Sequence, residues 1–454
     1  MDAQERKYIE MTTKPVARLV AGFAVPSIIC ILMTSFYNMA DTFFVSRLNT
    51  QSVAAVGIIF AYMGIIQSIS FFFGHGSGNY ISRALGARET DNAATMASTG
   101  LITSLITSAV IGIVCLIFKD PILRFFGATD TIMPYASKYF HYIVAGTPFI
   151  SGSIVLNNQM RLQGNARLSM IGILSGGFLN LALDPLLIFT FNMGVAGAGL
   201  ATAISQFLCF CLMVRICGLN GGIAINVRKF APTLRNLTEI AAGGLPSLAR
   251  QGLMFLSLIC LNNGAAIYGD SAVAAFSVTS RVIAIAASIL IGFGQGFQPV
   301  CGFNYGARKY LRVKEGVRFT FTYGTIYCTV FAIAAFIFAP EIIQIFSNSD
   351  SELLRMGTIA LRCHCVTFPL VATIIVSNMF FQNIRRTGPA VLVACARQGL
   401  FFVPAVLIGN ALAGINGLYA AQPISDLCAF ILCLPPPLTR LRSLIFTIAV
   451  KCQK

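Results

Sequence analysis

Long apolar runs dominate the chain, and glycine, proline and charged residues interrupt them at intervals. A helix needs about 20 mostly apolar residues to cross a bilayer. The pattern therefore predicts twelve transmembrane helices, over residues 16–46, 53–82, 93–118, 135–160, 169–190, 195–217, 237–268, 272–303, 315–338, 357–382, 389–411 and 416–437. The first run is too long for the core of a signal peptide, and Arg47 follows it rather than a cleavage site, so we expect it to be retained.

The two halves of the chain repeat each other at an offset of 220 residues. The matched residues include Pro26 with Pro246, Ala55 with Ala275, Arg88 with Arg308, Asn158 with Asn378, and Gly194 with Gly414. Each half holds an even number of predicted spans, so both halves enter the membrane in the same direction, as a parallel repeat. The predicted fold is an all-α polytopic membrane protein with two six-helix bundles, which can rock against each other to give alternating access.

The repeat also divides the chain into four parts. Residues 1–217 are predicted to form an N-terminal lobe, residues 218–236 a polar cytoplasmic linker, residues 237–437 a C-terminal lobe, and residues 438–454 a cytoplasmic tail. The tail is apolar and basic, and the sequence suggests no role for it.

Composition and charge sharpen this picture. Only 11% of the residues are charged, whereas an ordinary globular domain carries about a quarter. Of the 32 Lys and Arg, 23 lie on the same side of the predicted spans as both termini, and six lie on the other side. The positive-inside rule then places both termini in the cytoplasm. The basic excess therefore indicates topology and requires no nucleic-acid partner.

Motifs for catalysis and for cofactors are missing. The sequence has no Gly-x-Ser-x-Gly elbow, no His-Glu-x-x-His and no Gly-x-x-x-x-Gly-Lys, which argues against an enzyme and against built-in ATP hydrolysis. The 14 cysteines are scattered without a Cys-x-x-Cys, so we expect no cofactor, no bound zinc and no disulfide scaffold.

Two carboxylates inside predicted spans have no counterpart in the second half. Asp41 in the first span matches Leu261, and the region that matches Asp184 in the fifth span reads Phe-Phe-Val-Pro. A carboxylate in mid-membrane costs about 2.5–3.5 kcal/mol, so it should carry a proton, hold a cation or meet a partner. The structural alternative is that Asp184 caps a helix break at Pro185 and Asp41 lies near the outer interface.

Other oxygen-bearing side chains accompany these acids. Asn180 lies four residues before Asp184, and therefore on the same helix face, and Thr202 adds a hydroxyl from the sixth span. Carboxylate, amide and hydroxyl oxygens suit a hard cation, so Asp41, Asn180, Asp184 and Thr202 could hold Na⁺. They equally suit two carboxyl groups that share a proton.

The remaining polar residues within spans predict a hinge and a cavity. Pro26 removes a helical hydrogen bond in the same span as Asp41 and is predicted to be a moving part. Arg250, Arg281 and Arg397 either extend to the interface, neutralise a buried partner such as Asp426, or meet an anionic substrate group. The residues predicted to line a cavity for amphipathic organic compounds are Asn38, Asn157, Gln206, Arg250, Gln295 and Asn378.

These features resemble the MATE (multidrug and toxic-compound extrusion) family along nearly the whole chain. The resemblance rests on Pro26…Asn38-x-x-Asp41…Val53-Ala54-Ala55, on Gly-Ala-Arg after the second and eighth spans, and on Asn180-x-x-x-Asp184-Pro185. The acids in spans one and five are similar to the DinF/MepA-like branch, whereas the NorM-like branch also has acids in the C-terminal half.

The resemblance implies a V-shaped antiporter in a bacterial or archaeal inner membrane. It would export drug-like, often cationic compounds while H⁺ or Na⁺ enters, as a monomer and with no ATPase partner. The family pattern implies a cation site of Asp41, Asp184, Asn180 and Thr202 with a fourth-span tyrosine, which falls on Tyr139, although Tyr135 and Tyr142 compete for this role. The alternative is a flippase for lipid-linked saccharides, because the intramembrane arginines would suit a pyrophosphate headgroup.

Overall fold

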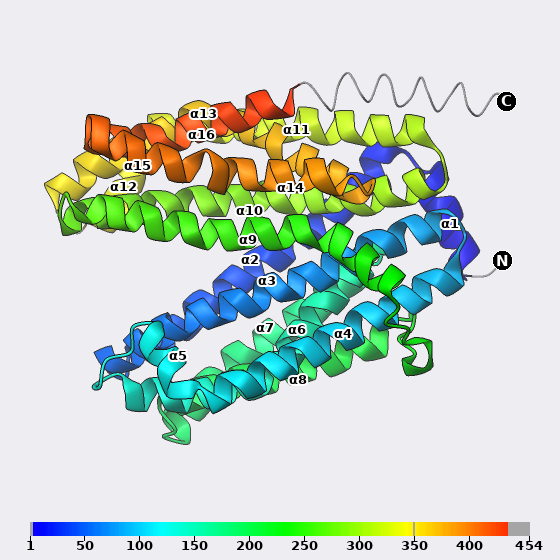
Figure 1. Cartoon of the computed structure of the whole chain (residues 1–454), viewed down its shortest axis with the longest axis horizontal. Helices are drawn as coiled ribbons and strands as arrows, with labels where there is room; N and C mark the ends of the chain where they lie inside the picture. The colour runs from blue at the N-terminus through cyan, green and yellow to red at the C-terminus, as the bar shows by residue number, and fades with distance from the viewer. Residues whose placement is uncertain (1–2, 348–349, 435–454) are drawn as a thin grey trace. The chain divides into compact units, whose positions relative to one another are not determined.

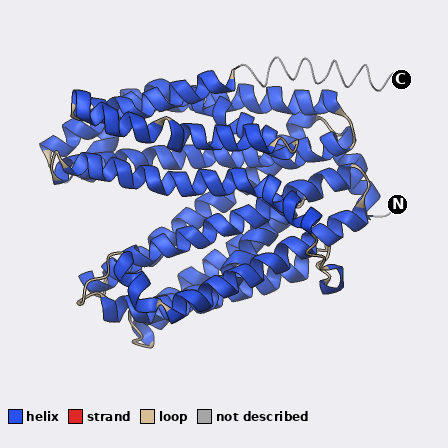
Figure 2. Ribbon diagram, in the orientation of Figure 1, coloured by secondary structure: helices blue, strands red, loops and turns tan. Residues whose placement is uncertain are grey.

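The computed structural model describes residues 3–347 and 350–434 (Figure 1). Throughout these residues the regular structure is helical, as Figure 2 shows. The predicted tail at 438–454, and the last three residues of the final predicted span, lie outside the described residues.

The first half of the chain contains the helices that precede the linker. They are α1 (Ala3–Thr13), α2 (Val16–Ser46), α3 (Thr50–Gly86), α4 (Thr90–Ile117), α5 (Lys119–Phe125), α6 (Met133–Leu162), α7 (Ala166–Pro185), the π-helical turn η1 (Leu186–Thr190) and α8 (Val195–Ile216). A short 3₁₀ turn, η2 (Val227–Lys229), lies in the linker.

The second half repeats this order. Its helices are α9 (Leu234–Ala266), α10 (Asp270–Gly306), α11 (Tyr310–Ile337), α12 (Ala339–Ser347), α13 (Ser351–Asn383), α14 (Thr387–Cys395), the π-helical turn η3 (Ala396–Leu400), α15 (Phe402–Ala413) and α16 (Ile415–Cys433). The all-α fold predicted from the apolar pattern is confirmed.

Within the described residues, eleven helices are long and apolar enough to cross a membrane. The twelfth predicted span corresponds to α16, which has 19 residues and includes the polar Gln422 and Asp426. The prediction missed the short helices α1, α5 and α12. They are too short to span a bilayer, so a search for long apolar runs cannot find them.

The backbone reproduces the 220-residue repeat. Helices α3 and α10 are both 37 residues long, and both end in a Gly-Ala-Arg turn. In each turn the arginine adopts a left-handed conformation, with φ of 64° at Arg88 and 58° at Arg308. Gly194 and Gly414 precede α8 and α16 with φ of 59° and 58°, a region that favours glycine because it has no Cβ. The halves are therefore copies of one backbone plan.

The chain forms two compact units. The first contains the described residues up to Lys14 together with Val25–Leu248, and the second contains Pro15–Ala24 together with the described residues from Ala249 onward. The divisions fall within α2 and α9, close to Pro26 and Pro246 respectively. Each of these helices therefore contributes residues to both units.

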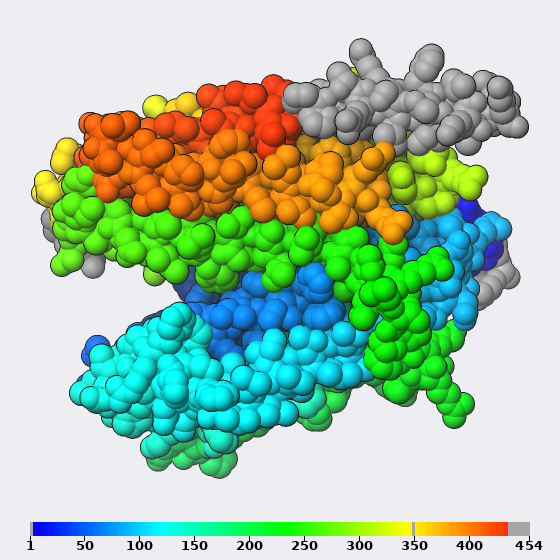
Figure 3. Space-filling view, viewed as in Figure 1, coloured from blue at the N-terminus to red at the C-terminus, as the bar shows by residue number. Residues whose placement is uncertain are grey.

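Close helix packing builds each unit. In the first unit, α6 packs against α3, α4 and α8; in the second, α13 packs in the same way against α10, α11 and α16. Figure 3 shows side chains filling the space between neighbouring helices within a unit. Gly76 and its equivalent Gly296 both permit close contacts, because a Cβ on Gly76 would collide with the backbone of Ile240 and a Cβ on Gly296 with the backbone of Ala24.

Large apolar side chains also cover the outside of each bundle. On α4, Val110 and Ile113 are 53% and 59% exposed, and their equivalents on α11, Val330 and Ile333, are 62% and 57% exposed. A monomeric soluble protein rarely exposes such stripes, whereas lipid tails cover them without cost.

Candidate cation site

Helix α7, in the fifth predicted span, places Asp184 and Asn180 in the interior of the first unit. Asp184 is 0% exposed and Asn180 is 2% exposed. Pro185 follows Asp184 directly, and because proline has no N–H, the regular hydrogen-bond ladder cannot continue through it. The chain then forms the π-helical turn η1, in which Phe191 N–H donates to Leu186 O at 3.0 Å. Single π turns within α-helices are frequent at functional sites.

Helix α2 supplies the second carboxylate. Asp41 is 9% exposed, and the hydroxyl of Tyr139 on α6 donates to its Oδ2 at 3.4 Å. Tyr139 is itself buried, whereas Tyr135 and Tyr142 are only partly buried and show no bond to either acid. The geometry thus favours Tyr139 among the three tyrosines that the sequence left open.

Asn180 connects the second acid to α8. Its Nδ2 donates to Asp184 Oδ1 at 3.3 Å and to Thr202 Oγ1 at 3.4 Å. Asp41 and Asp184 also lie within electrostatic range of each other and of Tyr139. The five residues predicted to form the cation site therefore lie together in the interior of one unit.

Three buried oxygens in this group have no hydrogen-bond partner: Asp41 Oδ1, Asp184 Oδ2 and Asn180 Oδ1. A buried polar atom without a partner is rare and costs about 1–3 kcal/mol, so it calls for an explanation. Oxygen ligands are those that a proton or a hard cation such as Na⁺ would take. The residues present therefore fit either ion.

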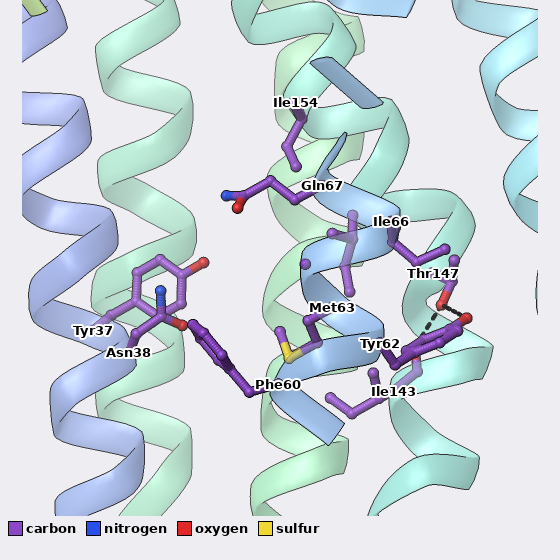
Figure 4. Close-up of a pocket in the computed structure, with 12 residues that line it drawn as sticks. Tyr37, Asn38, Phe60, Tyr62, Met63, Ile66, Gln67, Ile143, Thr147 and Ile154 are labelled. Carbon is purple, nitrogen blue, oxygen red and sulfur yellow. Dashed lines mark hydrogen bonds between the residues drawn. The ribbon is translucent and has the colours of Figure 1, made fainter. Parts of the chain in front are cut away.

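A pocket opens one helical turn from Asp41 (Figure 4). Tyr37 and Asn38 of α2 face Phe60, Met63 and Gln67 of α3 across it, and its other lining residues come from α3 and α6. Aromatic rings and a thioether are soft, adaptable surfaces that attract organic cations. Helix α2 carries both Asp41 and one wall of the pocket, so a movement of α2 would displace the carboxylate and that wall together.

The predicted cavity residues do not all lie in this pocket. Asn38 does, whereas Asn157 donates to Ser169 Oγ at 2.6 Å. In the second unit, Arg250 donates to Asn378 Oδ1 at 3.3 Å. Gln206 and Gln295 are partly buried. The role of these residues in substrate binding remains a prediction.

The intramembrane arginines lie in different environments. Arg397 Nε lies 2.7 Å from Asp426 Oδ1, so Arg397 has the buried partner that the sequence suggested. Arg281 is exposed on α10, where it can extend along the helix surface.

Several residues near the site were missed from sequence. Tyr37 lies one turn before Asp41 and within range of its charge. Ser205 lies three residues after Thr202 and carries another buried, unpartnered oxygen. The spacing of three or four residues from a predicted ligand was the available signal.

Comparison with known proteins identifies the family of the chain. The MatE family model matches the chain twice, over residues 26–186 and 246–407, so each half contains one copy and more than half of the chain is matched. The start points of the two matches differ by the same offset that the sequence repeat shows.

Relatives match along almost their whole length. The multidrug export protein MepA of Staphylococcus haemolyticus (strain JCSC1435) is 27% identical over 415 residues, which cover 90% of each chain. MepA of Staphylococcus aureus (strain MSSA476) is 27% identical over 434 residues, covering 94% of this chain and 95% of that protein.

A solved structure agrees equally well. A multidrug resistance MATE family transporter of the MOP superfamily, in an outward-facing conformation, superposes with a TM-score of 0.89 at 25% identity. The match covers 96% of this chain and 98% of that chain. The protein is therefore a multi-pass membrane transporter of the MATE family, with MepA-like relatives.

Proposed function

We propose that this transporter is a secondary active antiporter that exports amphipathic or cationic organic compounds in exchange for H⁺ or Na⁺. The observation that carries the proposal is the set of three buried, unpartnered oxygens shared by Asp41, Asp184 and Asn180. The names of its relatives, multidrug export proteins, support the direction and the class of substrate.

The exchange follows from the position of α2. Without a bound cation, two carboxylates within electrostatic range repel each other. A proton or Na⁺ removes that repulsion and supplies the missing partner, so the stable position of α2 depends on the ion. Tyr37 and Asn38 move with α2, which changes the pocket and releases its contents. Pro26, beside the division between the units, is the proposed hinge.

The driving force is the ion gradient and the membrane potential. Each positive charge that moves inward gains about 2.3 kcal/mol per 100 mV. The cytoplasmic termini inferred from the charge count make the side that bears α1 the cytoplasmic side. We propose that the chain works as a monomer in a bacterial or archaeal cell membrane, because all five residues of the candidate cation site belong to one chain.

The test is export of ethidium from proteoliposomes, with a pH gradient and a Na⁺ gradient imposed separately. We expect one of the two gradients to drive export in the wild-type protein and to fail in Asp184→Asn. Asp130→Asn is the matched control, because this carboxylate is 85% exposed and pairs with Arg124 at the surface. Equal coupled export by wild type and Asp184→Asn would refute the assignment.

The structure weakens one argument for the saccharide flippase. Of the three intramembrane arginines that could have bound a pyrophosphate headgroup, Arg397 is paired with Asp426. Failure to complement a flippase deletion, together with drug resistance in a pump-deficient host, is the expected pair of results.

A further inference from the structure

The second unit contains a buried ion pair that has no charged equivalent in the first unit. Arg397 lies in η3, and its Nε is 2.7 Å from Asp426 Oδ1 on α16. Asp426 is 2% exposed, and the side chain of Arg397 is 16% exposed. A buried pair of this kind is a weak source of stability, because desolvation offsets the attraction. Its presence therefore asks for another explanation.

Both oxygens of Asp426 accept hydrogen bonds. Gln422 Nε2 donates to Oδ1 at 2.8 Å, and Thr367 Oγ1 donates to Oδ2 at 3.2 Å. The other titratable groups in range are His364 on α13, which senses both charges, and Cys328 on α11, which senses Arg397. Unlike the acids of the first unit, Asp426 has no oxygen without a hydrogen-bond partner.

The backbone holds the arginine in place. Ser425 Oγ donates to Arg397 O at 2.5 Å, and Ser257 Oγ donates to Gln398 O. These bonds satisfy carbonyls in the π-helical turn. They hold the backbone from which the Arg397 side chain extends, so the guanidinium stays covalently tethered beside the carboxylate, unlike a mobile ion.

The repeat shows that this pair is built on the same scaffold as the cation site. Gln422 matches Thr202, and Thr367 matches Thr147 at the 220-residue offset. Asp426 matches Gln206, and Arg397 matches Gly177, so neither charge has an equivalent in the first half. The fifth span of each half contains a π-helical turn, although at different positions: η1 follows Pro185, whereas η3 contains Arg397 and matches residues 176–180.

We propose that the guanidinium of Arg397 is a tethered counter-ion that takes the place of a bound cation in the second unit. It keeps Asp426 from binding a coupling ion and so confines ion binding to the first unit. Arg397 thereby sets the number of ions exchanged per substrate. This inference rests on the proposed antiport, but its first test does not require transport.

That test counts bound cations on the purified full-length protein in detergent. Proton uptake is measured with a pH electrode in weakly buffered solution, and Na⁺ binding with ²²Na⁺. We expect Arg397→Gln to bind one more cation per chain than wild type, because Asp426 then lacks a counter-ion. Arg397→Lys, which keeps the charge, and Arg397→Gln/Asp426→Asn, which removes both charges, should bind the wild-type number.

Two results would overturn the proposal. One is a folded Arg397→Gln protein with the wild-type cation number. The other is an extra cation that persists in Arg397→Gln/Asp426→Asn, since Asp426 would then not be its ligand. If Arg397→Gln does not fold, Asp426→Asn decides alone: it should bind the wild-type number, and loss of a cation would contradict the proposal.

A transport measurement separates this inference from the antiport itself. In proteoliposomes, the substrate gradient at zero net flux reports the number of ions per substrate. We expect this number to rise by one in Arg397→Gln and to stay unchanged in Arg397→Lys. Absence of ion-driven export in wild type would refute the proposed function, whereas the binding count would still decide the role of Arg397. An unchanged number in an active Arg397→Gln protein would refute the tethered counter-ion alone.

Discussion

In the N-terminal unit, α7 places Asp184 in the interior, within electrostatic range of a second acid, Asp41. Each of these acids has one oxygen without a hydrogen-bond partner. In the C-terminal unit, η3 places Arg397 in the interior, where it pairs with a single acid, Asp426. Both oxygens of Asp426 accept hydrogen bonds. The two halves share one backbone plan, and their long helices follow the same order. The difference teaches that two halves with one backbone plan can carry different charged side chains, and we propose that these side chains decide which half responds to an ion.

The comparison breaks most sharply if the N-terminal acids are removed. We expect Asp41→Asn or Asp184→Asn to lower gradient-driven export by about 5- to 150-fold, the range typical of coupling between two sites. Asp426→Asn should have a much smaller effect, because Asp426 takes no part in the proposed ion exchange. Export of ethidium from proteoliposomes measures all three. Similar losses in all three variants would mean that the two units do not differ in function.

Stability sharpens the comparison at the C-terminal pair. Arg397→Leu leaves Asp426 buried without its counter-ion, and we expect a loss of about 3–5 kcal/mol in unfolding free energy. Arg397→Leu/Asp426→Leu removes both charges and should cost much less. Unfolding in SDS, followed by circular dichroism, reports the difference. Equal losses in the single and double variants would show that the pair does not act as a unit.

The shared scaffold predicts matched effects at equivalent glycines. Gly76→Ala and Gly296→Ala should each destabilise by about 1–3 kcal/mol, because the new methyl group collides with backbone that cannot rotate away. Gly57→Ala, where a Cβ would meet nothing within 4 Å, serves as the control. Thermal unfolding measures all three. A strong effect at only one of the two equivalent glycines would argue against a backbone plan shared by the two halves.

The smallest expected effect concerns α1, which has no α-helical equivalent before α9. Lys7 donates to Asn165 Oδ1 at 2.6 Å, and burial lowers the pKa of Lys7 to about 7, against an opposing attraction from Glu10. The unfolded or undocked chain, with the ordinary lysine pKa of 10.5, binds more protons between these two values. Docking of α1 should therefore tighten as the pH rises from 7 towards 10.

Hydrogen exchange of the α1 amides measures this docking. Protection should increase over that pH range in wild type, after correction for the intrinsic exchange rate, and should be flat in Lys7→Met. Lys14→Met is the matched control, because Lys14 pairs with Glu10 at the surface and is about half exposed. A rise of equal size in Lys7→Met would remove Lys7 as the cause.

The membrane fold could be predicted from sequence because its signals are local. An apolar run reveals a span by its length, and the offset between Pro26 and Pro246 reveals the repeat. Asn180 and Asp184 lie four residues apart on one helix, so their hydrogen bond was also predictable. The grouping of Asp41 with Asp184 came from their lack of counterparts in the second half and from the family resemblance.

Contacts between helices were harder to predict. Arg397 and Asp426 lie on different helices, and the choice of Asp426 depends on how each helix is rotated about its axis. Hydrophobic periodicity fixes that rotation in soluble proteins. In a bilayer both the lipid face and the packed face are apolar, so the pattern carries little information about rotation. The choice of Tyr139 over Tyr135 and Tyr142 was open for the same reason.

The central claim is that only the N-terminal unit exchanges a cation, and counting cations in three carboxylate variants tests it most directly. Proton uptake and ²²Na⁺ binding are measured on purified wild type, Asp41→Asn, Asp184→Asn and Asp426→Asn. The account predicts that Asp41→Asn and Asp184→Asn each lose a bound cation, while Asp426→Asn keeps the wild-type number. Loss of a cation in Asp426→Asn, with full binding in the other two, would contradict it.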